Sequence, residues 1–190
     1  MKRILTTVAL LLSSGIAVAH TGHDVHGFSS GLMHPIGGMD HLLAMLAVGL
    51  WSAAVMPRQL WAAPAAFMGL MLVGAMLGVA GVTLPLLEPG IALSVVIMGL
   101  LLIGLTRLGA APALALIGVF ALFHGNAHGA EAPLGGSVAL YMAGFLISTG
   151  LLHLAGVGIG TTVMRTAQVW ALRVIGGGMG VAGLWLLLAS

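Results

Sequence analysis

Six apolar stretches, each close to the length of a membrane-crossing helix, account for most of the chain. A helix needs about 20 consecutive apolar residues to cross the hydrocarbon core of a bilayer. Short segments containing proline, glycine or arginine separate the stretches, which cover residues 34–56, 60–81, 90–106, 110–128, 136–157 and 168–189. The pattern therefore predicts an all-α integral membrane protein. We expect a compact bundle of six transmembrane helices over residues 34–190, with sequence neighbours packed antiparallel.

The first residues follow the three-part pattern of a secretory signal peptide. Lys2 and Arg3 form a basic start, an apolar stretch continues to Val18, and Ala17-Val18-Ala19 matches a small-residue cleavage site. The apolar stretch is short for a membrane-spanning helix, although an uncleaved first span is the alternative. We therefore expect a cleavable signal peptide over residues 1–19 and a periplasmic, histidine-rich leader over residues 20–33.

The composition excludes a water-soluble fold. Hydrophobic residues make up 60% of the 190 residues and charged residues only 5%, whereas about a quarter of the residues of a soluble domain are charged. The formal net charge is only +2, which gives no indication of nucleic-acid binding. The chain has no Cys, so any metal site must use imidazole, carboxylate, thioether or backbone ligands.

The charges of the mature chain all agree with one orientation in the membrane. A removed signal peptide places the mature N-terminus outside, and the helix ends then alternate between the two sides. All four arginines of the mature chain then fall on the inner side, namely Arg58, Arg107, Arg165 and Arg173. All four acids fall on the outer side, namely Asp24, Asp40, Glu88 and Glu131. We therefore expect a multi-pass protein of the bacterial inner membrane whose mature N- and C-termini are both periplasmic.

The strongest chemical signal begins the first predicted span, where His34 is followed by Asp40, His41 and Met45. On a 3.6-residue period His34, His41 and Met45 lie on roughly one helix face, and Asp40 projects about 100° away from His41. Asp40 is expected to point toward a neighbouring helix or to orient an imidazole. Ionisable groups at membrane depth are costly and usually serve a site, so this is a candidate cation site, with interfacial polar residues as the alternative.

The second signal lies at the outer end of the fourth span. His124 and His128 are four residues apart and Glu131 follows three later, so a continuous helix would place all three on one face. Gly125 and Gly129 could instead interrupt the helix and turn backbone carbonyls toward an ion, as in the broken helices of transporters.

Weaker candidates lie above and below these two motifs. His153 lies in the fifth span toward the cytoplasmic side, where it would be a relay or exit ligand, although a single His on an apolar helix is more often a packing residue. His20, His23 and His26 form a histidine-rich tract of the kind that binds metals loosely. Glycines four residues apart predict close helix packing at three places, Gly74 and Gly78, Gly156 and Gly160, and Gly176 and Gly180.

Over essentially its whole length the chain resembles the HupE/UreJ family of nickel permease-like membrane proteins. The resemblance rests on the signal peptide, on the H-x5-D-H pattern that begins at His34, and on the F-H-G-x-A-H-G-x-E pattern from Phe123 to Glu131. It implies transport of Ni2+, or of Co2+, from the periplasm to the cytoplasm. The path residues that it implies are His34, Asp40, His41, His124, His128 and Glu131.

The expected activity is that of a secondary transporter or facilitator and not of an enzyme. No G-x4-G-K-[ST] motif is present, so the chain itself does not hydrolyse nucleotide, and facilitated diffusion or ion-gradient coupling both remain open. No cofactor is expected, and the expected partners are the lipid bilayer and a metal-ion substrate, without nucleic acid. A homo-oligomer is left open. Imidazole with carboxylate would also suit Zn2+ or Cu2+.

Two other function classes remain as alternatives. An intramembrane metal-dependent hydrolase would use a His and carboxylate site to activate water, but the chain has no H-E-x-x-H motif. A haem-binding membrane protein would use paired histidines on facing helices as axial ligands.

Overall fold

The computed structural model describes residues 27–132 and 137–189, and over these residues the chain is helical with no strand. In chain order the helices are α2 (Phe28–Gly37), α3 (Met39–Val55), α4 (Ala62–Val79), α5 (Leu87–Gly104), α6 (Ala110–Ala130), α7 (Val138–Arg165) and α8 (Val169–Ala189). The predicted signal peptide and His20, His23 and His26 lie outside the described residues. The prediction of an all-α, multi-span bundle is confirmed.

The first predicted span differs from expectation, because it is broken. Helices α4 to α8 are each long and apolar enough to cross a membrane, and α2 with α3 makes a sixth span only as a pair bent by 81°. Pro35 has no N–H to donate within α2, and Gly38, between the two helices, is extended with φ −92° and ψ 119°. Proline and glycine together account for the break.

Helix α2 also begins at Phe28, inside the predicted leader, and not at residue 34. The contact with α7 explains the earlier start. A Cβ on Gly31 would collide with the Tyr141 carbonyl, and a Cβ on Gly144 would collide with the Phe28 carbonyl. The two backbones therefore touch, and this tertiary contact stabilises a segment that is too polar to be read as part of a span.

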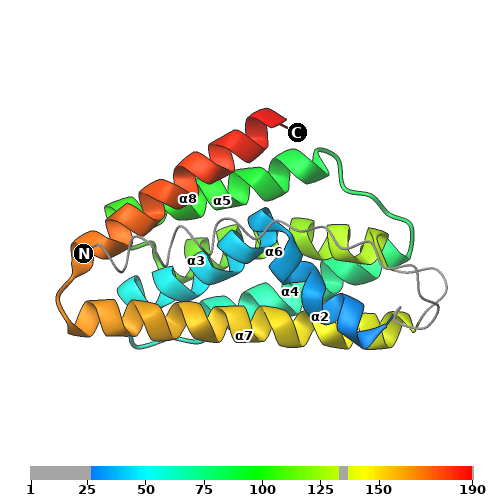
Figure 1. Cartoon of the computed structure of the whole chain (residues 1–190), viewed down its shortest axis with the longest axis horizontal. Helices are drawn as coiled ribbons and strands as arrows, with labels where there is room; N and C mark the ends of the chain where they lie inside the picture. The colour runs from blue at the N-terminus through cyan, green and yellow to red at the C-terminus, as the bar shows by residue number, and fades with distance from the viewer. Residues whose placement is uncertain (1–26, 133–136, 190) are drawn as a thin grey trace, which may run out of the picture.

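The tightest helix pairs are not sequence neighbours. Helix α3 packs against α7, α4 against α6, and α5 against α8, and Figure 1 shows α5 and α8 side by side, oblique to the long α7. Glycines permit each contact: Gly49 meets the His153 carbonyl, Gly125 meets the Met71 carbonyl, and Gly99 meets the Gly180 backbone. The predicted role of small residues in close packing is confirmed, including Gly74, Gly78, Gly156, Gly160 and Gly176.

Apolar side chains cover the outside of the bundle as well as its core. On α8, for example, Trp170, Val181, Trp185 and Leu188 are all well exposed. A soluble protein rarely exposes so much contiguous apolar surface, whereas lipid is a favourable solvent for it. The outward faces of the helices are therefore suited to contact with acyl chains.

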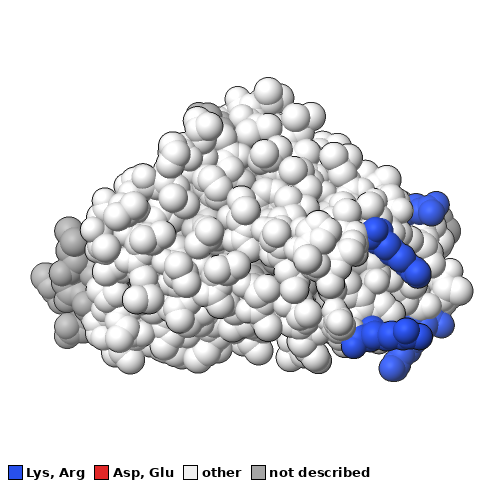
Figure 2. All heavy atoms as spheres, turned by 180° about the vertical axis from the view of Figure 1, so that it is seen from behind, with Lys and Arg blue, Asp and Glu red and all other residues white. Residues whose placement is uncertain are grey.

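Charged side chains lie at the two ends of the bundle. Figure 2 shows arginine side chains gathered at one end of the visible face, and Arg58 and Arg107 line a cavity between the α3–α4 and α5–α6 connections. Asp40, Glu88 and Glu131 lie at the opposite ends of α3, α5 and α6 and line one pocket together. This separation agrees with the predicted orientation, whose two compartments stay a prediction.

Candidate metal-binding site

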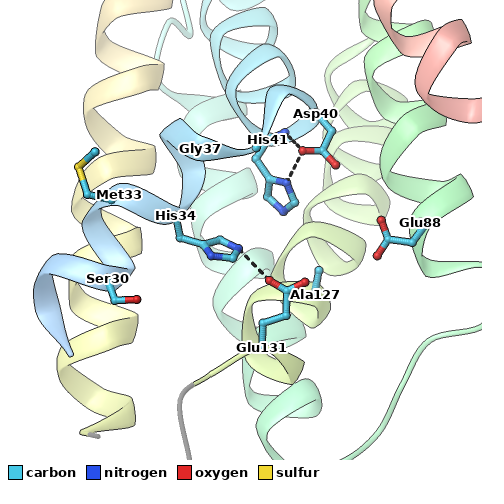
Figure 3. Close-up of a pocket in the computed structure, with 10 residues that line it drawn as sticks. Ser30, Met33, His34, Gly37, Asp40, His41, Glu88, Ala127 and Glu131 are labelled. Atoms are coloured by element: carbon cyan, nitrogen blue, oxygen red, sulfur yellow. Dashed lines mark hydrogen bonds and ion pairs between the residues drawn. The ribbon is translucent and has the colours of Figure 1, made fainter. Parts of the chain in front are cut away.

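The acidic end of the bundle contains a pocket of about 500 Å³. It lies where the break between α2 and α3 faces the start of α5 and the end of α6 (Figure 3). Its lining residues are Ser30, Met33, His34, Gly37, Gly38, Asp40, His41, Glu88, Ala127 and Glu131. The pocket thus joins two of the predicted motifs with an additional carboxylate, Glu88, which points into it (Figure 3).

The break at Gly38 decides how the first motif is arranged. His34 lies on α2 and His41 on α3, so the predicted single helix face through His34, His41 and Met45 is wrong. The 81° bend still brings the two rings to a centroid distance of 5.9 Å. Without the bend the two imidazoles would be separated by about two helical turns along a straight axis.

Asp40 orients the imidazole of His41, which was one of the two roles predicted for it. Its Oδ1 accepts hydrogen bonds from the His41 backbone N at 2.7 Å and from His41 Nδ1 at 2.8 Å. A Cβ on Gly38 would lie only 2.8 Å from the same Oδ1, so the glycine makes room for the folded-back carboxylate. With its proton held on Nδ1, His41 has a bare lone pair on Nε2, the nitrogen that a metal can bind.

The second motif lies on a continuous helix, because α6 runs unbroken through Gly125 and Gly129 to Ala130. Both glycines lie where α6 touches α4, and a Cβ on either would collide with a carbonyl, that of Met71 or of Ala75. The glycines therefore serve close packing and do not break the helix. His124 and His128 are fully buried on the inner face.

Glu131 follows directly after α6, at the rim of the pocket. Its Oε2 lies 3.0 Å from His34 Nε2 (Figure 3). This hydrogen bond lowers the pKa of the Glu131 carboxyl, and partial burial opposes the effect. Glu131 is therefore ionised at neutral pH and adds a negative charge to the pocket.

The four imidazoles of the two motifs form a contiguous cluster, which we call the histidine cluster: His34, His41, His124 and His128. Ring centroids are 4.6 Å apart for His41 and His128, 4.7 Å for His41 and His124, and 4.8 Å for His34 and His128. His128 also stacks on Phe145 at 4.6 Å with an interplanar angle of 9°. Three helices, α2, α3 and α6, supply the rings, and α7 supports them from one side.

Several ring nitrogens in the cluster have no hydrogen-bond partner in the described part of the chain. They are His41 Nε2, His124 Nδ1 and both nitrogens of His128. A buried polar atom without a partner is unfavourable by about 1–3 kcal/mol, and most buried polar atoms in proteins are paired. The histidine cluster therefore contains four of the buried side-chain atoms that have no partner among the described residues.

Ser94 of α5 sets the tautomer of His124. The Ser94 hydroxyl donates its one proton to the Ile91 carbonyl at 2.6 Å, and its oxygen lies 2.9 Å from His124 Nε2. We assign the hydroxyl proton to the shorter of these two contacts, the one with Ile91, and on this assignment His124 Nε2 donates to Ser94. The lone pair of His124 is then on Nδ1, one of the unpartnered nitrogens.

The histidine cluster does not form a complete set of ligands around one point. Across residues 27–132 and 137–189, no three His, Cys, Asp or Glu side chains converge closely enough to hold one metal ion together. The rings instead meet edge to face in succession. This arrangement is a series of neighbouring imidazoles from three helices.

The weaker predicted residues that the structure describes lie beneath the cluster. Met45 is buried one turn below His41 on α3, and His153 is buried on α7 with both ring nitrogens unpartnered among the described residues. Phe67 lies between the two levels, with its ring centroid 5.6 Å from His124 and 5.1 Å from His153.

Sequence reasoning missed Ser94 and Phe67 as neighbours of the site, and it used Glu88 only to orient the chain. Ser94 and Phe67 lie inside apolar spans with no pattern around them, so only the helix packing identifies them. A signal for Glu88 did exist, since it is an acid at the same predicted end as Asp40 and Glu131.

Comparisons with known proteins agree with the motifs. A family model described as HupE / UreJ protein matches residues 8–186. Among curated proteins, Protein HupE of Rhizobium leguminosarum bv. viciae is 40% identical over 186 residues, which cover 98% of this chain and 97% of the relative. No solved structure matches. The chain therefore belongs to the HupE/UreJ family.

Proposed function

We propose that this protein is a permease for a divalent transition-metal ion, Ni2+ or Co2+, which it moves from the periplasm to the cytoplasm. Membership of the HupE/UreJ family and the multi-span bundle support a metal permease role. The observation that carries the proposal is the histidine cluster, in which buried imidazole nitrogens from different helices have no hydrogen-bond partner among residues 27–132 and 137–189. Imidazole is a preferred ligand of these ions.

The outer pocket would attract and dehydrate the ion. Asp40, Glu88 and Glu131 give it a negative potential, and a pocket lined by one sign of charge concentrates the opposite ion near its mouth. The Asp40 carboxylate and the His41 imidazole are adjacent there, so an ion could exchange water for oxygen and nitrogen ligands in steps. The lone pairs assigned to His41 Nε2 and His124 Nδ1 are free for an ion, and both nitrogens of His128 are also without a partner among the described residues.

Transfer inward would then proceed from the histidine cluster toward His153. The rings of the cluster lie within 4.6–5.9 Å of one another, so an ion can bind the next nitrogen before it leaves the previous one. Phe67 separates His124 from His153, and its ring must move for the ion to pass.

The two other function classes receive less support from the site. The imidazoles pack directly against one another, edge to face, and leave no planar slot in which a porphyrin could lie between two axial ligands. For a hydrolase, the described residues hold no preformed three-ligand site for a catalytic metal.

The proposal is tested by metal accumulation in intact cells that express the protein. The variants H41A and H128A should abolish Ni2+ accumulation, because each removes an imidazole from the centre of the cluster, while immunoblots show normal protein levels. Gln59→Ala, at the arginine-rich end far from the cluster, is the control and should accumulate Ni2+ as the unaltered protein does. Normal accumulation in both histidine variants would refute the proposal.

A further inference from the structure

Three side chains from three helices meet directly beneath the histidine cluster. The Thr149 hydroxyl of α7 donates to Met45 Sδ of α3 at 3.3 Å and lies 4.0 Å from Met71 Sδ of α4. All three residues are fully buried. Two thioether sulfurs thus face one hydroxyl at a single point inside the bundle.

Helix periodicity places this group one turn below the histidine cluster. Met45 follows His41 by four residues on α3, and Thr149 follows Phe145 by four residues on α7. Phe145 is the residue that stacks on His128. One helical turn corresponds to about 5.4 Å along the axis, so the sulfurs lie at the next level inward.

His153 lies one further turn inward, and its nitrogens are available. It follows Thr149 by four residues on α7, is buried to 1% exposure, and has no hydrogen-bond partner at either ring nitrogen within the described residues. On α3 the corresponding position is Gly49, whose missing side chain lets the backbones of α3 and α7 touch at the His153 carbonyl. On α4 it is Phe67, whose ring contacts the His153 ring at 5.1 Å.

The direction of the Thr149 hydroxyl is unusual for a helix. A buried Thr in a helix commonly donates back to the carbonyl four residues earlier. Two exposed threonines at the far end of α7 do so, Thr162 to the Gly158 carbonyl at 2.8 Å and the C-cap residue Thr166 to the Thr162 carbonyl at 3.0 Å. Thr149 instead turns its hydroxyl toward the two sulfurs, which are weak acceptors.

We propose that Met45, Met71, Thr149 and His153 form a second, deeper cation position that holds the transported ion in transit and selects it by soft ligands. The inference rests on the proposed function for the identity of the cargo. Thioether and imidazole suit late transition ions, whereas Mn2+ and Mg2+ prefer oxygen ligands. The outer pocket, with its carboxylates, would accept either kind of ion, and the deeper position would reject the harder one.

Transport kinetics of the variants M45L and M71L in reconstituted liposomes test the selectivity. Leu nearly conserves the volume of Met but removes the sulfur. Each variant should lower kcat for Ni2+ by roughly tenfold or more, as loss of a metal-supporting group does, and leave KM unchanged because the outer pocket is intact. The ratio of Ni2+ to Mn2+ transport should fall. M98L, at a buried Met of α5 outside this group, is the matched control and should behave as the unaltered protein.

A measurement on the unaltered protein covers the case in which a variant does not fold. X-ray absorption on the full chain loaded with excess Ni2+ should show sulfur in the nickel coordination shell, and sulfur should be lost in M45L/M71L. Sulfur absent at every loading, or wild-type kcat and selectivity in both folded single variants, would overturn the inference. If liposomes show no metal flux but sulfur ligation depends on Met45 and Met71, the permease proposal fails and the deeper binding position stands.

Discussion

The hydrogen bond between Ser94 and His124 gives a sharp prediction, because it connects a residue outside both motifs to a histidine that we propose as a metal ligand. The variant S94A removes a hydroxyl that accepts from His124 Nε2 at 2.9 Å. Ser94 is 1% exposed, so water does not readily replace the lost oxygen. The His124 proton is then free to move to Nδ1, which would occupy the lone pair that we assign to the ion.

Two considerations give the expected increase in the Kd for Ni2+ in S94A. Loss of an outer hydrogen-bond partner of a metal ligand typically weakens metal binding about 10- to 100-fold, which corresponds to about 1.4 to 2.8 kcal/mol. A buried donor left without an acceptor is unfavourable by about 1–3 kcal/mol. We therefore expect the Kd for Ni2+ to rise by about one to two orders of magnitude in S94A.

Isothermal titration calorimetry of the purified protein in detergent measures this change. The matched control is S148A, since Ser148 of α7 is equally buried but its hydroxyl has no partner among the described residues. S148A should bind Ni2+ with the affinity of the unaltered protein. Equal affinity in S94A and the unaltered protein, both folded, would refute the assigned tautomer and the role of Nδ1.

Three further predictions concern other parts of the molecule. Asp40→Asn should weaken Ni2+ binding about 10- to 100-fold in the same titration, because an amide no longer holds the His41 proton on Nδ1 as strongly; unchanged affinity would contradict this. Gly125→Ala should lower the free energy of unfolding by about 1–3 kcal/mol, since its Cβ would collide with the Met71 carbonyl. The control Gly177→Ala, with open space around it, should keep the melting temperature of the unaltered protein, and equal melting of both variants would refute the packing argument. A GFP fused after Ser190 should stay dark because both mature termini are predicted to be periplasmic, and bright cytoplasmic fluorescence would overturn the orientation.

Much of the fold could be predicted from the sequence because spans are set by length and hydropathy alone. The apolar stretches correspond to α4 through α8 within a few residues at most ends, although α7 continues to Arg165. The spacing of Gly74 and Gly78 predicted close backbone contacts, which the structure confirms. These features depend on local composition, which the sequence states directly.

The break at Gly38 was not predicted, because the local sequence is compatible with more than one outcome. Pro35 and Gly38 permit the break that the structure shows, but glycine also occurs in continuous helices, as Gly125 and Gly129 do in α6. The packing of α4 against α6 could not be predicted either, because α5 lies between these two helices in the chain. Only the packed structure shows which helices touch.

The residues of the histidine cluster could be singled out from the sequence, but the residues packed around them could not. His41 and His128 belong to recognisable motifs, since ionisable residues are rare in membrane spans. Ser94, Met71 and Phe67 are common residues of apolar helices and carry no such signal. Their roles arise from contacts between α3, α4, α5, α6 and α7, which the chain order alone does not specify.

Metal flux through the purified protein tests the central claim most directly. Liposomes that contain the protein, a metal-sensitive dye and a pH-sensitive dye would be exposed in turn to Ni2+, Co2+, Zn2+ and Cu2+. The account predicts entry of Ni2+ or Co2+ with the unaltered protein and none with H128A, and the pH dye reports whether protons move with the ion. Equal flux of every ion through both proteins, or no flux of any ion through the unaltered protein, would contradict it.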